Sequence, residues 1–351
     1  MDLFVPGVKS MDYENDLDDV VAYLYENKGI GPDGQYVFEE VNQATPESNL
    51  MRISPIYGSL DGGRSRHYVS VGDYDKDGYL DLIIAGLDDY EDKDGITDEN
   101  GNPVVHHDRR VLYLYKNNKG KGFIRQETPL DGDKPFTGLS RGSVHFADMD
   151  NDGWLDIVST GWADGTEGKL VGVEIGGDEI RFYRNLQNGE FQDVTDRFVG
   201  AAQGILDMLG IARDANYEVR DVFSAWGMDS GLMLATDFDQ DGKMDLWIHG
   251  AVAGGRPRFS SYLTFGMGED YASVEEWPTG ILPAHTVAKL GVMFADFNGD
   301  DIPDFYQRGC CDEICQDESV PEKFGQAYSW SRLFSISEGQ VGTYGYPQYA
   351  D

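Results

Sequence analysis

Apolar residues recur along this chain in short alternating runs that are separated by acidic turns. A run such as RHYVSVG precedes a turn, and a run such as LDLIIAG follows it. Short runs of this kind, rich in β-branched and aromatic residues and bounded by Gly, Asn and Asp, are typical of β-strands. The pattern therefore predicts strands for most of the chain, with a helix only at Ala201–Asp214 (AAQGILDMLGIARD).

One acidic turn occurs four times together with its flanking strands. DYDKDGYLDLIIAG begins at Asp73, DMDNDGWLDIVSTG at Asp148, DFDQDGKMDLWIHG at Asp237 and DFNGDDIPDFYQRG at Asp296. A weaker copy, DYENDLDDVVAYLYENKG, begins at Asp12. Each clear copy continues into an alternating run such as RVLYLYKNNKGKGF and a final short segment such as QDVTDRF. Each repeat is thus predicted to contain four antiparallel strands, with the acidic loop between the first two.

Repeated four-stranded units favour an all-β fold, a β-propeller in which each sheet is one blade. A β-sandwich is the alternative, but it offers no reason for the same hairpin to recur. We predict a single domain with approximate repeats at residues 1–60, 61–135, 136–222, 223–284 and 285–351. The first repeat is degenerate, or it is a partial blade completed by the C-terminal segment AYSWSRLFSIS. The five visible repeats form a ring alone or as part of a larger one.

Two polar segments interrupt this pattern between the predicted second and third strands of their repeats. They are Leu87–Asp108 and Gly161–Glu179. Both are predicted as loops. Long loops at one equivalent place should gather on one face of the assembly, where binding sites are commonly found.

The acidic turns carry oxygen ligands at positions 1, 3, 5 and 9, with glycine at position 6 in three copies. Side chains at alternate positions of a tight loop converge on one point, and glycine permits the sharp turn. With the carbonyl of position 7 they would surround calcium, which takes six to eight oxygens, better than magnesium, which keeps its waters. The predicted ligands are Asp73, Asp75, Asp77, Tyr79 and Asp81; Asp148, Asp150, Asp152, Trp154 and Asp156; Asp237, Asp239, Asp241, Lys243 and Asp245; and Asp296, Asn298, Asp300, Ile302 and Asp304.

Two other interpretations of the turns are weaker. An EF-hand needs Glu at position 12 and helices on both sides, whereas position 12 here holds Ile84, Ser159, Ile248 and Gln307. Solvated Asp-Gly turns are common, but four copies in one register favour metal. The fourth copy has Asp301 in place of glycine and should bind more weakly. The N-terminal loop is damaged and is not included in the predicted ligand sets.

The pattern D-x-D-x-D-G-x-x-D before an apolar strand, followed by runs such as FYRNLQNGEFQDVT, resembles the FG-GAP/VCBS family of repeats. Such repeats are also present in the heads of integrin α subunits and in some fungal lectins. The resemblance covers most of the chain. It implies a β-propeller with about four calcium ions that are mainly structural, and it is unspecific about activity.

Charge and composition narrow the possible partners. The net charge is −35 and the pI about 4.3, so nucleic acid and anionic membranes should be repelled. No apolar run reaches the length of a membrane span, and the N-terminus lacks the regions of a signal peptide. The protein therefore stays inside the cell or begins after a removed signal. Cys310, Cys311 and Cys315 form one local cluster, which leaves a short-range disulfide, a reduced trio or a zinc site open.

The leading functional hypothesis is a non-enzymatic binding module, extracellular or on a cell surface, that is stabilised by calcium. Extracellular calcium modules bind with dissociation constants of roughly 0.1–1 mM, so even weak loops would fill there. A carbohydrate or protein ligand, as in cell adhesion, is expected. Tyr90, Trp162 and Trp226 could stack on sugar rings, or they could simply cover blade edges.

Two alternatives belong to other classes. A polysaccharide lyase or hydrolase on a calcium propeller would draw on His106, His107 and Asp108, or on His249, Arg256 and Arg258. No nucleophile elbow, P-loop or HExxH pattern is present, so no catalytic residue is assigned. The other alternative is a purely structural repeat region of a larger surface protein.

Overall fold

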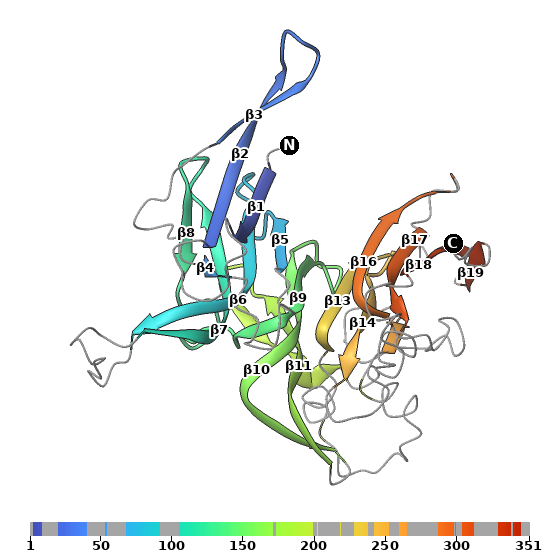
Figure 1. Cartoon of the computed structure of the whole chain (residues 1–351). Coiled ribbons are helices and arrows are strands. Elements are labelled where there is room, and N and C mark those ends of the chain that lie inside the picture. Colours follow the sequence, from blue (N-terminus) through green and yellow to red (C-terminus); the bar gives the residue numbers. More distant parts are fainter. Residues whose placement is uncertain are drawn as a thin grey trace. The chain divides into compact units, whose positions relative to one another are not determined.

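A computed structural model describes residues 3–8, 20–40, 53–54, 68–91, 105–170, 173–198, 202, 218, 228–237, 242–252, 260–264, 287–297, 299, 304–311, 329–337 and 340–344. Within these ranges the backbone is almost entirely strand and turn, and the sheets are antiparallel (Figure 1). The predicted all-β class is therefore confirmed. The chain divides into two compact units, Met1–Val144 and His145–Asp351.

The first unit contains two antiparallel meanders. The N-terminal one has three strands, β1 (Leu3–Val8), β2 (Val20–Ile30) and β3 (Tyr36–Glu40). The other has four strands, β5 (Tyr68–Gly72), β6 (Asp81–Glu91), β7 (Val105–Asn117) and β8 (Phe123–Gln126). The short strand β4 (Ile53–Ser54) pairs with the distal part of β6.

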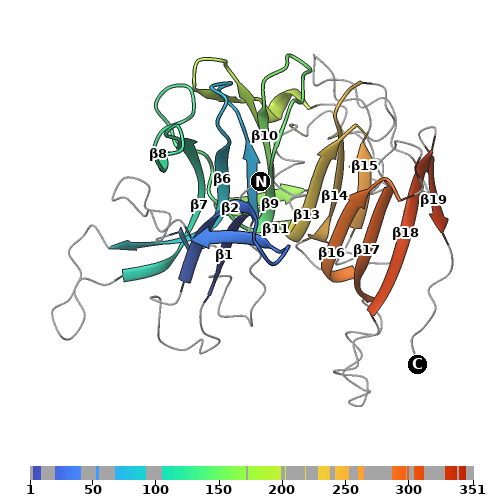
Figure 2. The ribbon, with the colours of Figure 1, turned by 90° about the horizontal axis from the view of Figure 1, so that it is seen from above.

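The second unit also consists of antiparallel meanders. Strand β9 (Leu139–Ala147) runs from the first unit into the second. It is followed by β10 (Asp156–Leu170), β11 (Val173–Asn185) and β12 (Phe191–Asp193). The next sheet consists of β13 (Met228–Thr236), β14 (Asp245–Val252) and β15 (Ser260–Thr264). The last, a meander in Figure 2, consists of β16 (Val287–Ala295), β17 (Asp304–Cys311), β18 (Ser329–Ser337) and β19 (Gln340–Tyr344).

The acidic loops connect the first and second strands of these sheets, as the sequence predicts. The strand pairs that close three of the loops are Gly72 with Asp81, Thr236 with Asp245, and Ala295 with Asp304. Each pair is nine residues apart. The N-terminal hairpin differs, because Val8 pairs with Val20 and the span is twelve residues. A valine thus begins the strand where the other hairpins have an aspartate.

The second strands of the two best-described repeats are buried on both faces. Every residue of Asp81–Gly86 in β6 is buried, and so is every residue of Asp156–Gly161 in β10. Since neighbouring residues of a strand point to opposite faces, both sides of each sheet must be covered here. The core of the second unit includes Phe182, whose ring stacks on Phe198 with centroids 3.6 Å apart.

Three sequence expectations need comment. Both predicted polar loops are partly strand, because β6 continues to Glu91, β7 begins at Val105, and only two residues separate β10 from β11. Backbone hydrogen bonding continues beyond the β-bulges in these strand pairs. The strands therefore extend into sequence that lacks a clear alternation of apolar and polar residues. The segment AYSWSRLFSIS contains strand β18, which pairs with β17 and β19.

The predicted helix at Ala201–Asp214 lies outside the described residues except for Ala202. Ala202 is helical, and its N–H donates to the carbonyl of Phe198 at 3.0 Å. Across the part of the chain that the structure describes, no helix combines the length and apolar character needed to cross a membrane.

Candidate metal centres

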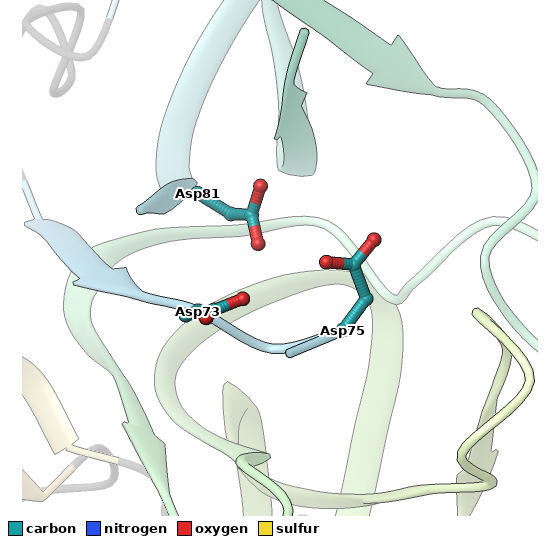
Figure 3. Close-up of side chains that lie close together, drawn as sticks. All are labelled: Asp73, Asp75 and Asp81. Carbon is teal, nitrogen blue, oxygen red and sulfur yellow. The ribbon is translucent and has the colours of Figure 1, made fainter. Parts of the chain in front are cut away.

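The structure brings three carboxylates together in each of two acidic loops. Oxygens of Asp73, Asp75 and Asp81 lie within 4.8 Å of one another, and the side chains point toward a common space (Figure 3). Asp148, Asp150 and Asp156 form the equivalent trio in the second loop. Oxygens that bind one calcium ion at 2.3–2.6 Å are at most about 5 Å apart. Both trios therefore have a spacing that one cation can bridge.

The first aspartate of each loop shapes the turn. Asp73 Oδ2 accepts the N–H of Gly78 at 2.9 Å, and Asp148 Oδ2 accepts that of Gly153 at 2.9 Å. Asp237 Oδ2 accepts the equivalent bond from Gly242 at 3.0 Å. These glycines have φ values of +89°, +83° and +84°, in the left-handed region that other residues avoid. Glycine at position 6 thus suits the left-handed backbone of these three loops.

The ninth residue of the loop ties three segments together. Asp81 is fully buried and accepts the N–H groups of Tyr74, at 3.2 Å, and Asn117, at 2.7 Å. These donors lie in the loop and at the end of β7. Asp156 does the same with Met149 at 3.0 Å and Asn185 at 2.8 Å.

The closing aspartates are costly when ionised. Burial raises the pKa of Asp81 to about 6, and the charges of Asp75 and Asp77 also raise it, while the two N–H donors oppose the shift. Burial likewise raises the pKa of Asp156 to about 7, with the charge of Asp150 acting in the same direction. The ionised trio therefore favours a neighbouring positive charge.

Among the described residues, two carboxylate oxygens at position 1 are buried without a hydrogen-bond partner. They are Asp148 Oδ1 and Asp237 Oδ1. An unpaired buried carboxylate oxygen carries a large desolvation cost, which a bound cation would remove. The residues of these loops thus fit a hard metal ion, both in their oxygen chemistry and in what their geometry leaves unsatisfied.

The fifth loop position is placed differently from the other predicted ligands. Asp77 and Asp152 do not belong to the convergent trios of the described residues. Their Oδ1 atoms accept the N–H groups of Tyr79, at 3.1 Å, and Trp154, at 2.9 Å. Tyr79 and Trp154, predicted to offer carbonyls, thus hold position 5 through their backbone nitrogens.

Two residues at the end of the third strand, a basic residue and the asparagine after it, were not predicted to belong to the site. Asn117 Nδ2 donates to the carbonyl of Leu80 at 2.9 Å, and Asn185 Nδ2 donates to that of Leu155 at 3.0 Å. Lys116 and Arg184 precede these asparagines and pair with loop carboxylates. The signal was present in the sequence, because YKN and YRN occupy the same place in the two repeats.

The other two predicted centres are described only in part. Asp237 and half-buried Lys243 belong to the third loop, and Asp245 begins β14. In the fourth loop, Asp304 is fully buried and accepts the N–H of Phe297 at 3.0 Å, while Asp296 accepts that of Gly299 at 2.6 Å. The remaining predicted ligands lie outside the described residues: Asp239, Asp241, Asn298, Asp300 and Ile302.

The candidates for other chemistry are spread over several strands. Trp162 is half-buried on β10. Tyr90 lies on β6, His106, His107 and Asp108 on β7, His249 on β14, and Cys310 and Cys311 on β17. Trp226, Arg256, Arg258 and Cys315 lie outside the described residues, as does the N-terminal acidic loop.

Comparison with known proteins gives little by sequence. No family model matches the chain, and no curated protein matches it. Among solved structures, the chain is similar to an Agrocybe aegerita lectin described for specific recognition of non-reducing terminal N-acetylglucosamine. The sequence identity is 14%, the TM-score is 0.35, and the similarity covers 97% of this chain and 78% of that chain.

Proposed function

We propose that the protein is a calcium-stabilised binding module, extracellular or on a cell surface, that engages a carbohydrate or protein ligand without catalysis. The observation that carries the metal part is the recurrence of one acidic hairpin whose carboxylates converge within 4.8 Å in both fully described copies. Calcium is the cation whose coordination number and oxygen preference suit this set. Four ions would offset eight of the 35 net negative charges.

The proposed architecture is a β-propeller of the FG-GAP/VCBS type. The support is twofold. The acidic hairpin recurs with a fixed nine-residue span, and β6 and β10 are buried on both faces. A sheet covered on both sides suits blades that pack against two neighbours, whereas the sheets of a sandwich keep one face in solvent.

A ligand surface is supported by exposed apolar side chains on the β2–β3 hairpin, which extends beyond β1 in Figure 1. Ile30 and Tyr36 are each 66% exposed, and Phe38 is 44% exposed. Grouped exposed apolar residues often mark a binding surface, and tyrosine combines an apolar ring with a polar tip. A carbohydrate is the first ligand class to test, and a protein is the second.

Calcium dependence is tested by thermal unfolding of the full chain in millimolar calcium and in EDTA. Because metal that binds only the folded state stabilises it, we expect a higher melting temperature in calcium. Magnesium at the same concentration should give a smaller shift. Equal melting temperatures in calcium and EDTA would contradict the proposal.

Ligand binding is tested on a glycan array in calcium and in EDTA. We expect binding to a defined sugar that is lost in EDTA and lost in a Tyr36→Ser, Phe38→Ser variant. Ile124→Ser, at a residue that is 42% exposed on β8, is the matched control and should bind normally. A blank array from folded, calcium-loaded protein would exclude the sugars tested and direct the search to protein partners.

A further inference from the structure

A basic side chain reaches the carboxylates of each fully described loop from the end of the third strand. Lys116 Nζ contacts Asp75 and lies 3.5 Å from Asp77 Oδ2. In the second loop, Arg184 Nε lies 2.7 Å from Asp150 Oδ2, and Arg184 Nη2 lies 3.4 Å from Asp152 Oδ2. In both loops one cation therefore joins the carboxylates of positions 3 and 5.

Lys116 and Arg184 occupy equivalent positions in the strand register. Tyr115 pairs with Leu82 and Tyr183 pairs with Ile157, so each cation follows the residue opposite the first apolar residue of the second strand. In the fourth repeat Phe334 pairs with Phe305, and the residue that follows it is Ser335. In the third, Thr264 pairs with Leu246 and is followed in the sequence by a phenylalanine. Of these four repeats, the first two thus carry a basic residue at this position.

The basic groups and a metal ion would share a carboxylate. Asp75 and Asp150 belong to the convergent trios, and the same two residues pair with Lys116 and Arg184. A positive charge beside the trio lowers the repulsion between its carboxylates, and it repels an entering divalent cation.

The cations also have room to leave. The side chain of Lys116 is 38% exposed, and that of Arg184 is 36% exposed. Each stem is long and flexible, so the charged group can turn into water without being buried unpaired. A metal ion can therefore replace the ion pair at modest cost.

We propose that Lys116 and Arg184 are resident counter-cations, which hold the first two acidic loops together in the metal-free protein and compete with the metal ion for Asp75 and Asp150. The proposal rests on the proposed calcium function of these loops. It makes the metal affinity of the first two sites a balance between a built-in cation and an external one. It also separates them from the third and fourth sites, whose sequences lack the cation.

The test compares Lys116→Met with Lys121→Met in the full chain. Lys121 is an exposed lysine in the turn that follows β7, so the control makes the same charge change away from the loop carboxylates. Two quantities are measured for each variant, the midpoint of urea unfolding in EDTA and the calcium affinity by titration calorimetry. Arg184→Met with Arg197→Met gives the same comparison at the second loop, because Arg197 is an exposed arginine at the end of the helical turn Thr195–Arg197.

We expect Lys116→Met to unfold at lower urea in EDTA than Lys121→Met and to bind calcium about tenfold more tightly at one site. Tenfold is the effect of one unit charge on a divalent ion about 6 Å away in a water-like dielectric. A variant that folds only in calcium would support the proposal equally, because the ion then replaces the missing charge.

Unchanged or weaker calcium binding by Lys116→Met and Arg184→Met, in a protein whose parent binds calcium, would overturn the counter-cation proposal and leave the calcium function standing. No calcium binding by the parent or any variant would overturn the calcium function, and this proposal with it. Variants that equal their controls in both measurements would show that the ion pairs are incidental surface contacts.

Discussion

The first and second acidic loops share most of their hydrogen bonds but differ at position 1 and in burial. In the first loop both oxygens of Asp73 accept backbone N–H groups, from Asp77 at 3.0 Å and Gly78 at 2.9 Å. In the second loop Asp148 Oδ1 is buried without a partner. Position 3 is also more enclosed, since the side chain of Asp150 is 3% exposed and that of Asp75 is 14% exposed.

This difference carries into the energetics of the two closing aspartates. Burial raises the pKa of Asp156 to about 7 and that of Asp81 to about 6. The same nine-residue pattern thus produces two centres with unequal need for a cation. The second loop should depend more on metal and on pH than the first, and the experiments below are ordered by the size of the expected effect.

The largest effect is expected from removing the closing aspartate. Asp156→Ala leaves two N–H donors, from Met149 and Asn185, without their acceptor and removes a proposed metal ligand. We expect a loss of about 3–5 kcal/mol in the free energy of unfolding in calcium, measured by urea titration. Asp131→Ala, in an exposed turn, is the control and should change stability by less than about 0.5 kcal/mol. An equal effect of the two substitutions would contradict the role of Asp156.

The next largest effect concerns pH in the absence of metal. The pKa of Asp156 rises from 3.8 to about 7 on folding, so between these values the folded state binds more protons than the unfolded state. The contribution of Asp156 to stability in EDTA is therefore greatest at low pH and is lost as pH rises through 7. Between these two pKa values the contribution of Asp156 to the free energy of unfolding changes by roughly 4 kcal/mol, at about 1.36 kcal/mol for each pH unit.

Comparing Asp156→Asn with Asp81→Asn isolates this contribution. Urea unfolding in EDTA from about pH 5 to 7.5 should give a flatter profile for Asp156→Asn than for the parent, and a smaller flattening for Asp81→Asn. In calcium the trend should reverse, because the metal binds only the ionised carboxylate. A parent-like slope for Asp156→Asn would show that this residue does not titrate in that range.

A smaller effect is expected at the asparagines that end the third strands. Asn185 is 2% exposed, its side chain donates to Leu155 O, and it accepts the N–H of Gln187 at 2.8 Å. Asn117 makes the same two kinds of bond in an exposed setting. We expect Asn185→Ala to cost about 2 kcal/mol and Asn117→Ala about 1 kcal/mol by urea unfolding in calcium. A larger loss for Asn117→Ala would reverse the order of the two loops.

The smallest effect is expected from a bond between the second and third acidic loops. Asn151 Nδ2 donates to the carbonyl of Gly242, in the third acidic loop, at 2.8 Å. Asn151 has a φ of +57°, so glycine can replace it without backbone strain. Asn151→Gly should lower stability by about 0.5 kcal/mol, since the bond is exposed. A cost above about 2 kcal/mol would mean that the third loop depends on this contact for its shape.

Much of the local structure follows from the sequence for physical reasons. The strands beside the acidic loops were predictable because they combine β-branched residues with tight Asp-Gly turns. The left-handed conformation of Gly78 was predictable because position 6 must reverse the chain. The long hairpin of β10 and β11 was not, because its pairing relies on backbone hydrogen bonds across a bulge between Trp162 and Glu167.

The same distinction between local sequence and tertiary structure holds for the candidate metal centres. Sequence spacing by itself determined that positions 1, 3 and 9 converge, since a short loop with a glycine reversal admits few backbone paths. It also predicted position 5, but Asp77 and Asp152 lie outside the convergent trios of the described residues. The tertiary structure decided what surrounds them. Lys116 lies 41 residues from Asp75, and Asn185 lies 29 residues from Asp156. Burial, counter-charge and pKa arise from such distant neighbours, and a local pattern of residues carries no information about which strand end will be brought beside it.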